Sequence, residues 1–319
     1  MNGLFYDPLR DQIIDYVGGR EDLEAGMVRA IGDPYQRIAE DKLRMLRADR
    51  FAVTFGFQID RHTEAAVRSE AERITVVSAE RIATEIRKML VHPHRRRAVE
   101  LLRYVNLLPV LLPESRALWD SEAAASSTGN GPNWESTLGI LGRLERPSFR
   151  VALAGLLWGI NANLRDADVV KSICARWRLT NHEKNGVLWM LQREPLVRNA
   201  QSVAWPVLQR TLIAAEIEEL LQLAEAIAME VNGSSRQIDF CRRKLRLPPD
   251  QLNPPLLITG NELRRAGFRS GPLYRQVLQQ VRDAQLEGKI DTPEQALELA
   301  AAIAEKAEKR DEESGGQKC

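Results

Sequence analysis

The chain of 319 residues is 44% hydrophobic and 28% charged, with a formal net charge of +1, which is ordinary for a globular protein with room for two or more domains. So small a net charge excludes nucleic-acid binding through a global positive field and leaves only local patches. No apolar run approaches the roughly 18 residues of a membrane span, and no apolar signal core follows Met1. Three scattered cysteines offer neither zinc spacing nor a disulfide framework. We therefore expect a cytoplasmic protein with no membrane partner.

Two short β-prone runs open the chain. They lie at residues 4–6 and 13–17 and are separated by the turn-forming residues 7–12, which predicts a β-hairpin. Gly18 and Gly19 end the second run. Two strands alone are marginally stable in water, so the hairpin indicates a sheet that lacks its other members.

From Asp33 onward the pattern is helical. Asp33 and Pro34 suit the cap and first position of a helix that Gly56 would end. Near the C-terminus we expect a proline-rich linker at residues 248–255 and then three helical segments up to residue 304. The charged residues 306–319 are predicted to be disordered. Between these segments we expect helices at residues 61–72, 79–90, 95–104, 134–144, 149–158, 167–177, 181–193, 205–231 and 237–245, with a loop at 120–133.

The clearest chemistry lies in the segment Glu40-Asp41-Lys42-Leu43-Arg44. On a helix, Asp41 and Arg44 would lie on one face. A carboxylate there can accept a hydrogen bond from the exocyclic amino group of cytosine or adenine, while a guanidinium donates to the neighbouring ring acceptor. Uracil and guanine present a carbonyl instead and would leave buried polar groups unpaired. The segment alone also fits an exposed, salt-bridged helix face.

Several motifs, taken in order, resemble those of bacterial class II CCA tRNA nucleotidyltransferases and their poly(A) polymerase relatives. The resemblance is carried by residues 2–8, 15–23, 29–34 and 40–51. It implies nucleotide addition to RNA 3′ ends from CTP and ATP, with CCA, A-only and poly(A) addition all compatible with these motifs. In the intact family enzyme the reaction uses Mg2+. The nucleotide-binding residues that the resemblance implies are Glu40, Asp41, Arg44, Arg47 and Arg50.

The resemblance also implies supporting roles for two segments. Gly18 and Gly19 would form a hinge between the palm and the neck, because glycine adopts backbone angles that other residues avoid. The helix that carries Arg81 and Glu85 would brace the nucleotide-reading segment. Arg81 and Glu85 are four residues apart and also fit an ordinary solvated ion pair.

Motifs that hold the catalytic metals in that family lie upstream of the segment matched by residues 2–8. Since the Asp-x-Asp pair and its Gly-rich loop do not precede Met1, we expect an N-terminally truncated chain with no catalytic residues or metal ligands of its own. It would bind no Mg2+ alone and be inactive as written. A genuine truncation and a gene start placed at an internal methionine both fit this pattern.

Two further segments bear on RNA binding and hydrolysis. Residues 92–97 (His-Pro-His-Arg-Arg-Arg) are basic enough for Arg95, Arg96 and Arg97 to contact phosphates, although a solvated helix face fits equally well. Relatives with a metal-dependent phosphohydrolase site have three ligand positions that are occupied here by Ser136, Trp158 and Gly159. None of these three side chains suits such a metal site, so a packed helical body is expected.

The predicted fold class is mainly α, with helical neck, body and tail domains after a remnant β-hairpin of the palm. The boundaries are 1–32 for the head remnant, 33–93 for the neck, 94–250 for the body and 255–305 for the RNA-binding tail. The expected partners are tRNA or another RNA 3′ end together with CTP and ATP. A stand-alone helical RNA-binding protein without catalysis is the alternative function.

Overall fold

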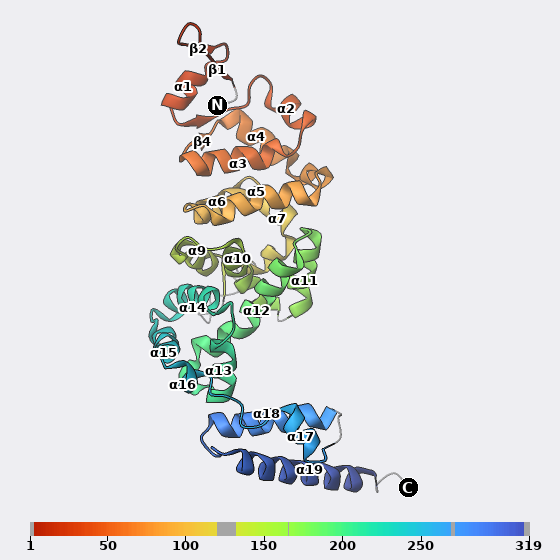
Figure 1. The fold of residues 1–319 in the computed structure, drawn as a ribbon. Coiled ribbons are helices and arrows are strands. Elements are labelled where there is room, and N and C mark those ends of the chain that lie inside the picture. Colours follow the sequence, from red (N-terminus) through yellow and green to blue (C-terminus); the bar gives the residue numbers. More distant parts are fainter. Residues whose placement is uncertain (1–2, 120–131, 165, 269–271, 316–319) are drawn as a thin grey trace. The chain divides into compact units, whose positions relative to one another are not determined.

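The computed structural model describes residues 3–119, 132–164, 166–268 and 272–315, and these residues are mainly α-helical (Figure 1). This confirms the predicted fold class. The chain divides into two compact units, one of Met1–Pro195 with Glu218–Ser235 and the other of Leu196–Ile217 with Arg236–Cys319. The boundary thus differs from the one expected near residue 250, because residues 196–217 and 236–250 fold with the tail.

The predicted hairpin is present. Strand β1 (Leu4–Asp7) pairs antiparallel with β2 (Gln12–Asp15), with Phe5 opposite Ile14. Helix α1 (Gly19–Glu24) follows, and a second, unpredicted pair joins β3 (Met27–Val28) in parallel to β4 (Gln58–Ile59). At two residues each, β3 and β4 are too short to produce a recognisable alternation of apolar and polar residues.

Residues 34–55, expected as one helix, form two. Helix α2 (Pro34–Glu40) ends at Asp41, whose backbone is extended (φ −148°, ψ 105°), and α3 (Arg44–Phe55) begins three residues later. The predicted ends are correct: the Asp33 side chain accepts a hydrogen bond from the backbone of Tyr35, and Gly56 takes a left-handed conformation (φ 73°).

The first unit is built around α10 (Phe149–Leu164), in which every residue from Val151 to Ile160 is buried. Helix α10 packs on α9 (Trp134–Arg143) and α5 (Ala79–Val91), and α5 packs in turn on α3 and α6 (Arg95–Tyr104). The predicted loop at 120–133 falls largely on residues 120–131, outside the described part of the chain. The other elements are α4 (Arg61–Glu70), η1 (Ala71–Val76), α7 (Leu108–Leu111), η2 (Pro113–Ser115), α11 (Ala167–Arg176), α12 (Asn181–Arg198, which runs into the second unit) and α14 (Ile217–Asn232).

The second unit has its own small core, formed by Ile258, Leu263, Val277, Val281, Ala296 and Ala300. The helix expected at 205–231 is broken after α13, and α14 belongs to the first unit. No helix among the described residues is long and apolar enough to cross a bilayer. The elements of the second unit are η3 (Ala200–Ser202), α13 (Trp205–Leu212), α15 (Arg236–Leu245), α16 (Pro249–Leu252), α17 (Gly260–Arg265), α18 (Pro272–Leu286) and α19 (Pro293–Gly315).

The predicted disorder of residues 306–319 is wrong for residues 306–315, because α19 continues to Gly315. Residues 300–313 are almost all alanine, glutamate, lysine and arginine, which have high helix propensity. The density of charge suggested disorder, whereas the intrinsic propensity of these residues favours a helix.

Candidate nucleotide-binding site

A cavity of about 500 Å3 lies in the first unit, lined by residues of α1, β3, α2, α3 and α4 and of the segments beside them. Its lining includes four arginines (Arg29, Arg37, Arg44 and Arg47) but one carboxylate, Asp22. Phe51, Phe55 and Phe57 provide an aromatic wall in which neighbouring ring centroids are 6.1 and 5.7 Å apart. The cavity therefore combines an excess of positive charge with aromatic surface.

Asp41 lies in the break between α2 and α3, not on a continuous helix as the sequence predicted. Its carboxylate accepts hydrogen bonds from the backbone of Leu43 at 3.1 Å and from Arg81 Nη2 at 2.9 Å. Partial burial alone would raise the pKa of Asp41, but these hydrogen bonds and the charges of Arg81 and Arg44 outweigh it, so that the pKa is lowered. Asp41 is not among the residues that line the cavity.

Arg44 begins α3 and lines the cavity. One of its terminal nitrogens, Nη1, is 3.1 Å from Glu40, which also pairs with Arg37 at 2.7 Å. Arg47, one turn further along α3, also lines the cavity and lies 5.9 Å from the Phe51 ring centroid. Of the five predicted nucleotide-binding residues, only Arg44 and Arg47 line the cavity.

Arg50 has a different environment. Its Nε is 2.5 Å from Glu85 of α5, and its guanidinium lies 4.2 Å from the Phe51 ring centroid. The contacts Arg50–Glu85 and Asp41–Arg81 both join α5 to residues 41–50. Arg81 and Glu85 therefore do not pair with each other. Arg50 therefore contacts α5 and does not line the cavity.

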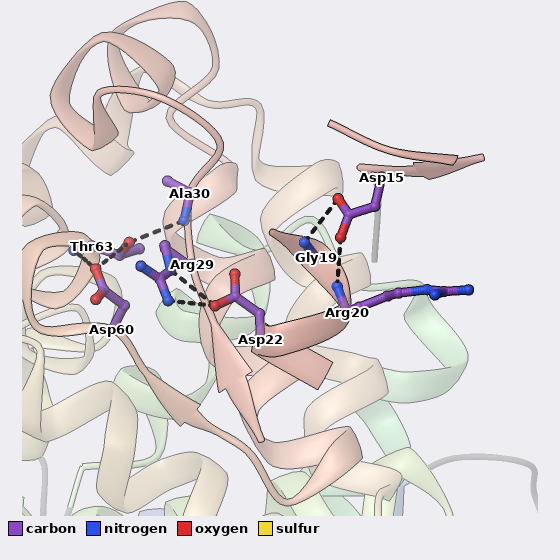
Figure 2. A network of polar contacts seen from close by, with 8 residues as sticks. All are labelled: Asp15, Gly19, Arg20, Asp22, Arg29, Ala30, Asp60 and Thr63. Carbon is purple, nitrogen blue, oxygen red and sulfur yellow. Dashed lines mark hydrogen bonds and ion pairs between the residues drawn. The ribbon is translucent and has the colours of Figure 1, made fainter. Parts of the chain in front are cut away.

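The two glycines of the predicted hinge lie at the start of α1. Gly18 is left-handed (φ 74°), and Gly19 is buried, so close to Leu4 that an added Cβ would lie 3.2 Å from it. Figure 2 shows the Asp15 carboxylate turned toward the first turn of α1. It accepts hydrogen bonds from the backbone of Val17, Gly19 and Arg20, with Arg20 the largest influence, and they lower the pKa of Asp15 to about 2.

A polar network that the sequence did not indicate connects α1 to α4 (Figure 2). Arg29 donates from Nε and Nη2 to the same oxygen of Asp22, at 3.0 and 2.5 Å, and this hydrogen bond raises the pKa of Arg29. The next backbone N–H, that of Ala30, donates to the Thr63 hydroxyl, which in turn donates to Asp60. Residues 29–34 were recognised as a motif, but nothing in the sequence indicated these partners.

The three arginines predicted to bind RNA are in different environments. Arg95 is 2% exposed and donates to the carbonyls of Leu90, Leu141 and Leu144. Its assignment to RNA binding is therefore wrong, because the guanidinium is enclosed. Arg96 is exposed and pairs with Glu100 at 2.9 Å, whereas Arg97 is exposed and donates to the carbonyl of Phe57 at 2.7 Å.

The three positions compared above with phosphohydrolase ligands are part of a packed segment. Ser136 forms a capping box with Asn133 at the start of α9, and Trp158 and Gly159 are buried in α10. A Cβ at position 159 would lie 2.8 Å from Leu118 and 2.9 Å from Thr137. Across the described parts of the chain, no group of three or more His, Cys, Asp or Glu side chains is placed to hold a metal ion.

Comparisons with known proteins identify the class. Residues 56–118 match a family model described as a probable RNA and SrmB-binding site of polymerase A. The chain is 27% identical over 299 residues to the CCA-adding enzyme of Leuconostoc mesenteroides, covering 91% of this chain and 66% of the relative. It is 27% identical over 308 residues to that of a Geobacillus species, covering 93% and 68%.

Solved structures show the same fold. The Bacillus stearothermophilus CCA-adding enzyme in complex with CTP has a TM-score of 0.68 at 21% identity, covering 97% of this chain and 72% of that one. The Thermotoga maritima enzyme complexed with tRNA has a TM-score of 0.54 at 20% identity, covering 93% and 69%. The helical fold after an N-terminal hairpin is thus the fold of these solved enzymes. Over about nine tenths of its length the chain is similar to bacterial CCA-adding enzymes, and it spans about two thirds of the length of these curated relatives.

Proposed function

We propose that this chain supplies the nucleotide-selecting and RNA-holding part of a tRNA nucleotidyltransferase that adds CCA to RNA 3′ ends from CTP and ATP. Residues 33–93 would select the nucleotide as the neck, and residues 94–250 and 255–305 would hold RNA as body and tail. The observation that carries the proposal is that Arg44 and Arg47 line an arginine-rich cavity, while Asp41 lies in the break just before the helix that carries them. The reaction would take place in the cytoplasm, where tRNA and both nucleotides occur, with poly(A) addition as a variant of the same chemistry.

Asp41 and Arg44 keep the hydrogen-bonding capacity that base selection needs. Each oxygen of a carboxylate has about two lone pairs, and each Asp41 oxygen has one protein donor, the backbone of Leu43 or Arg81. One lone pair on each oxygen therefore remains free to accept from the amino group of cytosine or adenine. A guanidinium has about five N–H donors, and Glu40 engages one nitrogen of Arg44. The remaining donors can reach the adjacent ring nitrogen.

Rejection of the other two bases follows from the same atoms. Uracil and guanine would turn a carbonyl oxygen toward the Asp41 carboxylate, so that two acceptors would face each other. The lowered pKa of Asp41 keeps its carboxylate charged near neutral pH, so it cannot donate to a carbonyl. A site built to hydrogen-bond one pattern rejects the other strongly because its buried polar groups are left unpaired.

The cavity arginines suit the phosphates of the nucleotide. Arg37, Arg44 and Arg47 line one cavity, and Arg47 has no carboxylate partner among the described residues. Guanidinium groups bind phosphate oxygens through paired, charge-assisted hydrogen bonds. Among the described residues, no three His, Cys, Asp or Glu side chains are grouped so as to hold a metal ion, and no metal ligand is proposed among them.

Nucleotide titrations by calorimetry test the proposal. The protein should bind CTP and ATP more tightly than UTP and GTP, and Asp41→Ala should weaken CTP and ATP binding about 10- to 100-fold, the effect of losing a buried hydrogen bond to a charged group. Glu72→Ala is a matched control, because Glu72 is exposed and lies outside the cavity. Equal affinity for all four nucleotides would overturn the proposal. If tRNA were still bound, that result would establish the stand-alone RNA-binding protein, the function that the match of residues 56–118 favours on its own.

A further inference from the structure

Helix α15 of the second unit carries a concentration of positive charge to which neither the motifs nor the candidate site assigns a role. Its ten residues include Arg236, Arg242, Arg243 and Lys244 against a single acid, Asp239, and Arg246 follows directly. The whole chain has a net charge of only +1, so this helix is far more basic than the average of the molecule.

The charge faces outward because the opposite side of α15 is fixed in the core. Ile238 and Cys241 are fully buried. Arg243 is five residues after Ile238 and two after Cys241, which places it about 140° and 200° away around the helix axis. Arg243 and Arg246 are accordingly exposed.

The charge of these two arginines is not neutralised within the protein. Asp239 lies 3.7 Å from Arg242, and neither Arg243 nor Arg246 has a carboxylate partner in the part of the chain that the structure describes. The ammonium of Lys244 lies near two aromatic rings, 4.9 Å from the Trp205 centroid and 5.6 Å from the Phe240 centroid. Cation–π contacts of this kind hold a charged group in place without neutralising it.

We infer that Arg243, Lys244 and Arg246, here called the α15 basic face, bind the sugar–phosphate backbone of the RNA substrate. Unpaired guanidinium groups fit phosphate oxygens, and phosphate contacts position an RNA without reading its sequence. Half-buried aromatic side chains beside such cations are typical of surfaces that bind nucleic acids. That the bound RNA is a tRNA rests on the proposed function. The existence of the basic surface does not depend on it.

The test compares two double variants in their affinity for unmodified tRNA lacking its CCA end, measured across a series of salt concentrations. Arg243→Ser with Arg246→Ser should weaken binding about tenfold at moderate salt and reduce the slope of log affinity against log salt by about two, one per lost phosphate contact. Arg243→Lys with Arg246→Lys should restore most of the slope, which separates charge from folding.

The matched control removes two exposed cations that are already neutralised. Lys171 pairs with Asp168 at 2.7 Å, and Lys289 pairs with Glu287 at 2.6 Å. Lys171→Ser with Lys289→Ser changes the net charge equally and should leave the salt slope unchanged. A drop equal to that of the α15 variant would attribute the effect to net charge and overturn the inference.

Two further outcomes keep the inference separate from the proposed function. If the α15 variant bound tRNA with the same affinity and the same salt dependence as the wild type, the inference would be overturned, whichever nucleotides the protein prefers. If polyglutamate bound the wild type but not this variant while tRNA binding stayed intact, the surface would serve an acidic protein instead. Loss of tRNA affinity in a protein without CTP or ATP preference would support the RNA surface and contradict the proposed function. CTP affinity itself should not change in the α15 variant.

Discussion

Among single residues, Asp49 is a carboxyl buried without a hydrogen-bond partner in the described part of the chain. It lies on α3, is fully buried, and neither of its carboxylate oxygens has a hydrogen-bond partner among the described residues. Burial, and secondarily the charge of Glu64, raises the pKa of Asp49 well above its usual range. The folded protein therefore holds this carboxyl in its neutral form over a pH range in which the unfolded chain would ionise it.

Asp49→Asn should consequently change how stability depends on pH. Below about pH 4, the pKa of this carboxyl in the unfolded chain, Asp49 is neutral in both states and the free energy of unfolding is not reduced. As the pH rises from there through the raised pKa of the folded state, the free energy of unfolding falls. Within that window the wild type should lose about 1.4 kcal/mol per pH unit relative to the variant. Urea unfolding at pH 4 to 8 measures the difference. Asp168→Asn is the exposed control, and parallel curves for wild type and Asp49→Asn would contradict the assignment.

Asp41 and Arg44 should act as a unit on one base edge. Asp41→Ala and Arg44→Ala should each weaken CTP and ATP binding, and the double variant should lose less than the sum, because either substitution already removes the paired recognition. Calorimetric titration of the four proteins closes the cycle. Additive losses would mean that the two side chains contact the nucleotide independently.

At the scale of elements, the sequence predicted helix positions better than helix interruptions. The segment 95–104 matches α6 at both ends. The break at Asp41 was missed because apolar spacing continues across it from Ile38 to Met45, while a single aspartate caps the following turn. Long-range partners such as Arg81 for Asp41, or the enclosure of Arg95, depend on packing between helices that no local pattern encodes.

Two glycines on neighbouring helices should respond oppositely to alanine. Gly159→Ala in α10 forces a Cβ to 2.8 Å from Leu118 and should destabilise the protein by about 1–3 kcal/mol through overpacking. At Gly142 in α9 the nearest atom would be 3.6 Å away, on the Arg96 side chain. Gly142→Ala should therefore stabilise by up to about 1 kcal/mol through helix propensity. Thermal unfolding of both variants provides the measurement, and equal signs would contradict this account of α10 packing.

The β1–β2 hairpin should exchange its amide hydrogens much faster than α10. Phe5 and Tyr6 are each 61% exposed and Ile13 is 48% exposed, so the hairpin has little buried apolar surface, and an isolated two-stranded ribbon is marginal. Hydrogen exchange followed by mass spectrometry should show early exchange at residues 4–15 and protection at residues 151–160. Equal protection of the two segments in a monomer would show that the hairpin is held by contacts other than those described.

At the scale of the molecule, Arg95 connects the ends of two helices to α6. Its guanidinium donates to a carbonyl at the end of α5 and to two at the end of α9. Because these carbonyls cannot all find other donors when buried, Arg95→Met should destabilise the first unit by on the order of 3 kcal/mol. Arg96→Met, at an exposed neighbour, should stay within about 0.5 kcal/mol. Chemical denaturation compares the two variants, and similar losses would contradict the structural role of Arg95.

The break between α2 and α3 has a consequence for how sequences of this kind can vary in length. A residue inserted in α3 between Arg44 and Arg47 would rotate everything after it by about 100°, turning Arg47 away from the cavity. A residue added within α2 would not rotate α3, because the helix ends at Asp41 and the extended backbone there can accommodate the change. The interval from Asp41 to Arg44 has no such freedom, since the turn is closed by hydrogen bonds from Leu43 and Arg44 back to Asp41. Tolerance to insertion should therefore change abruptly at one residue, permissive before Asp41 and restrictive from Asp41 onward.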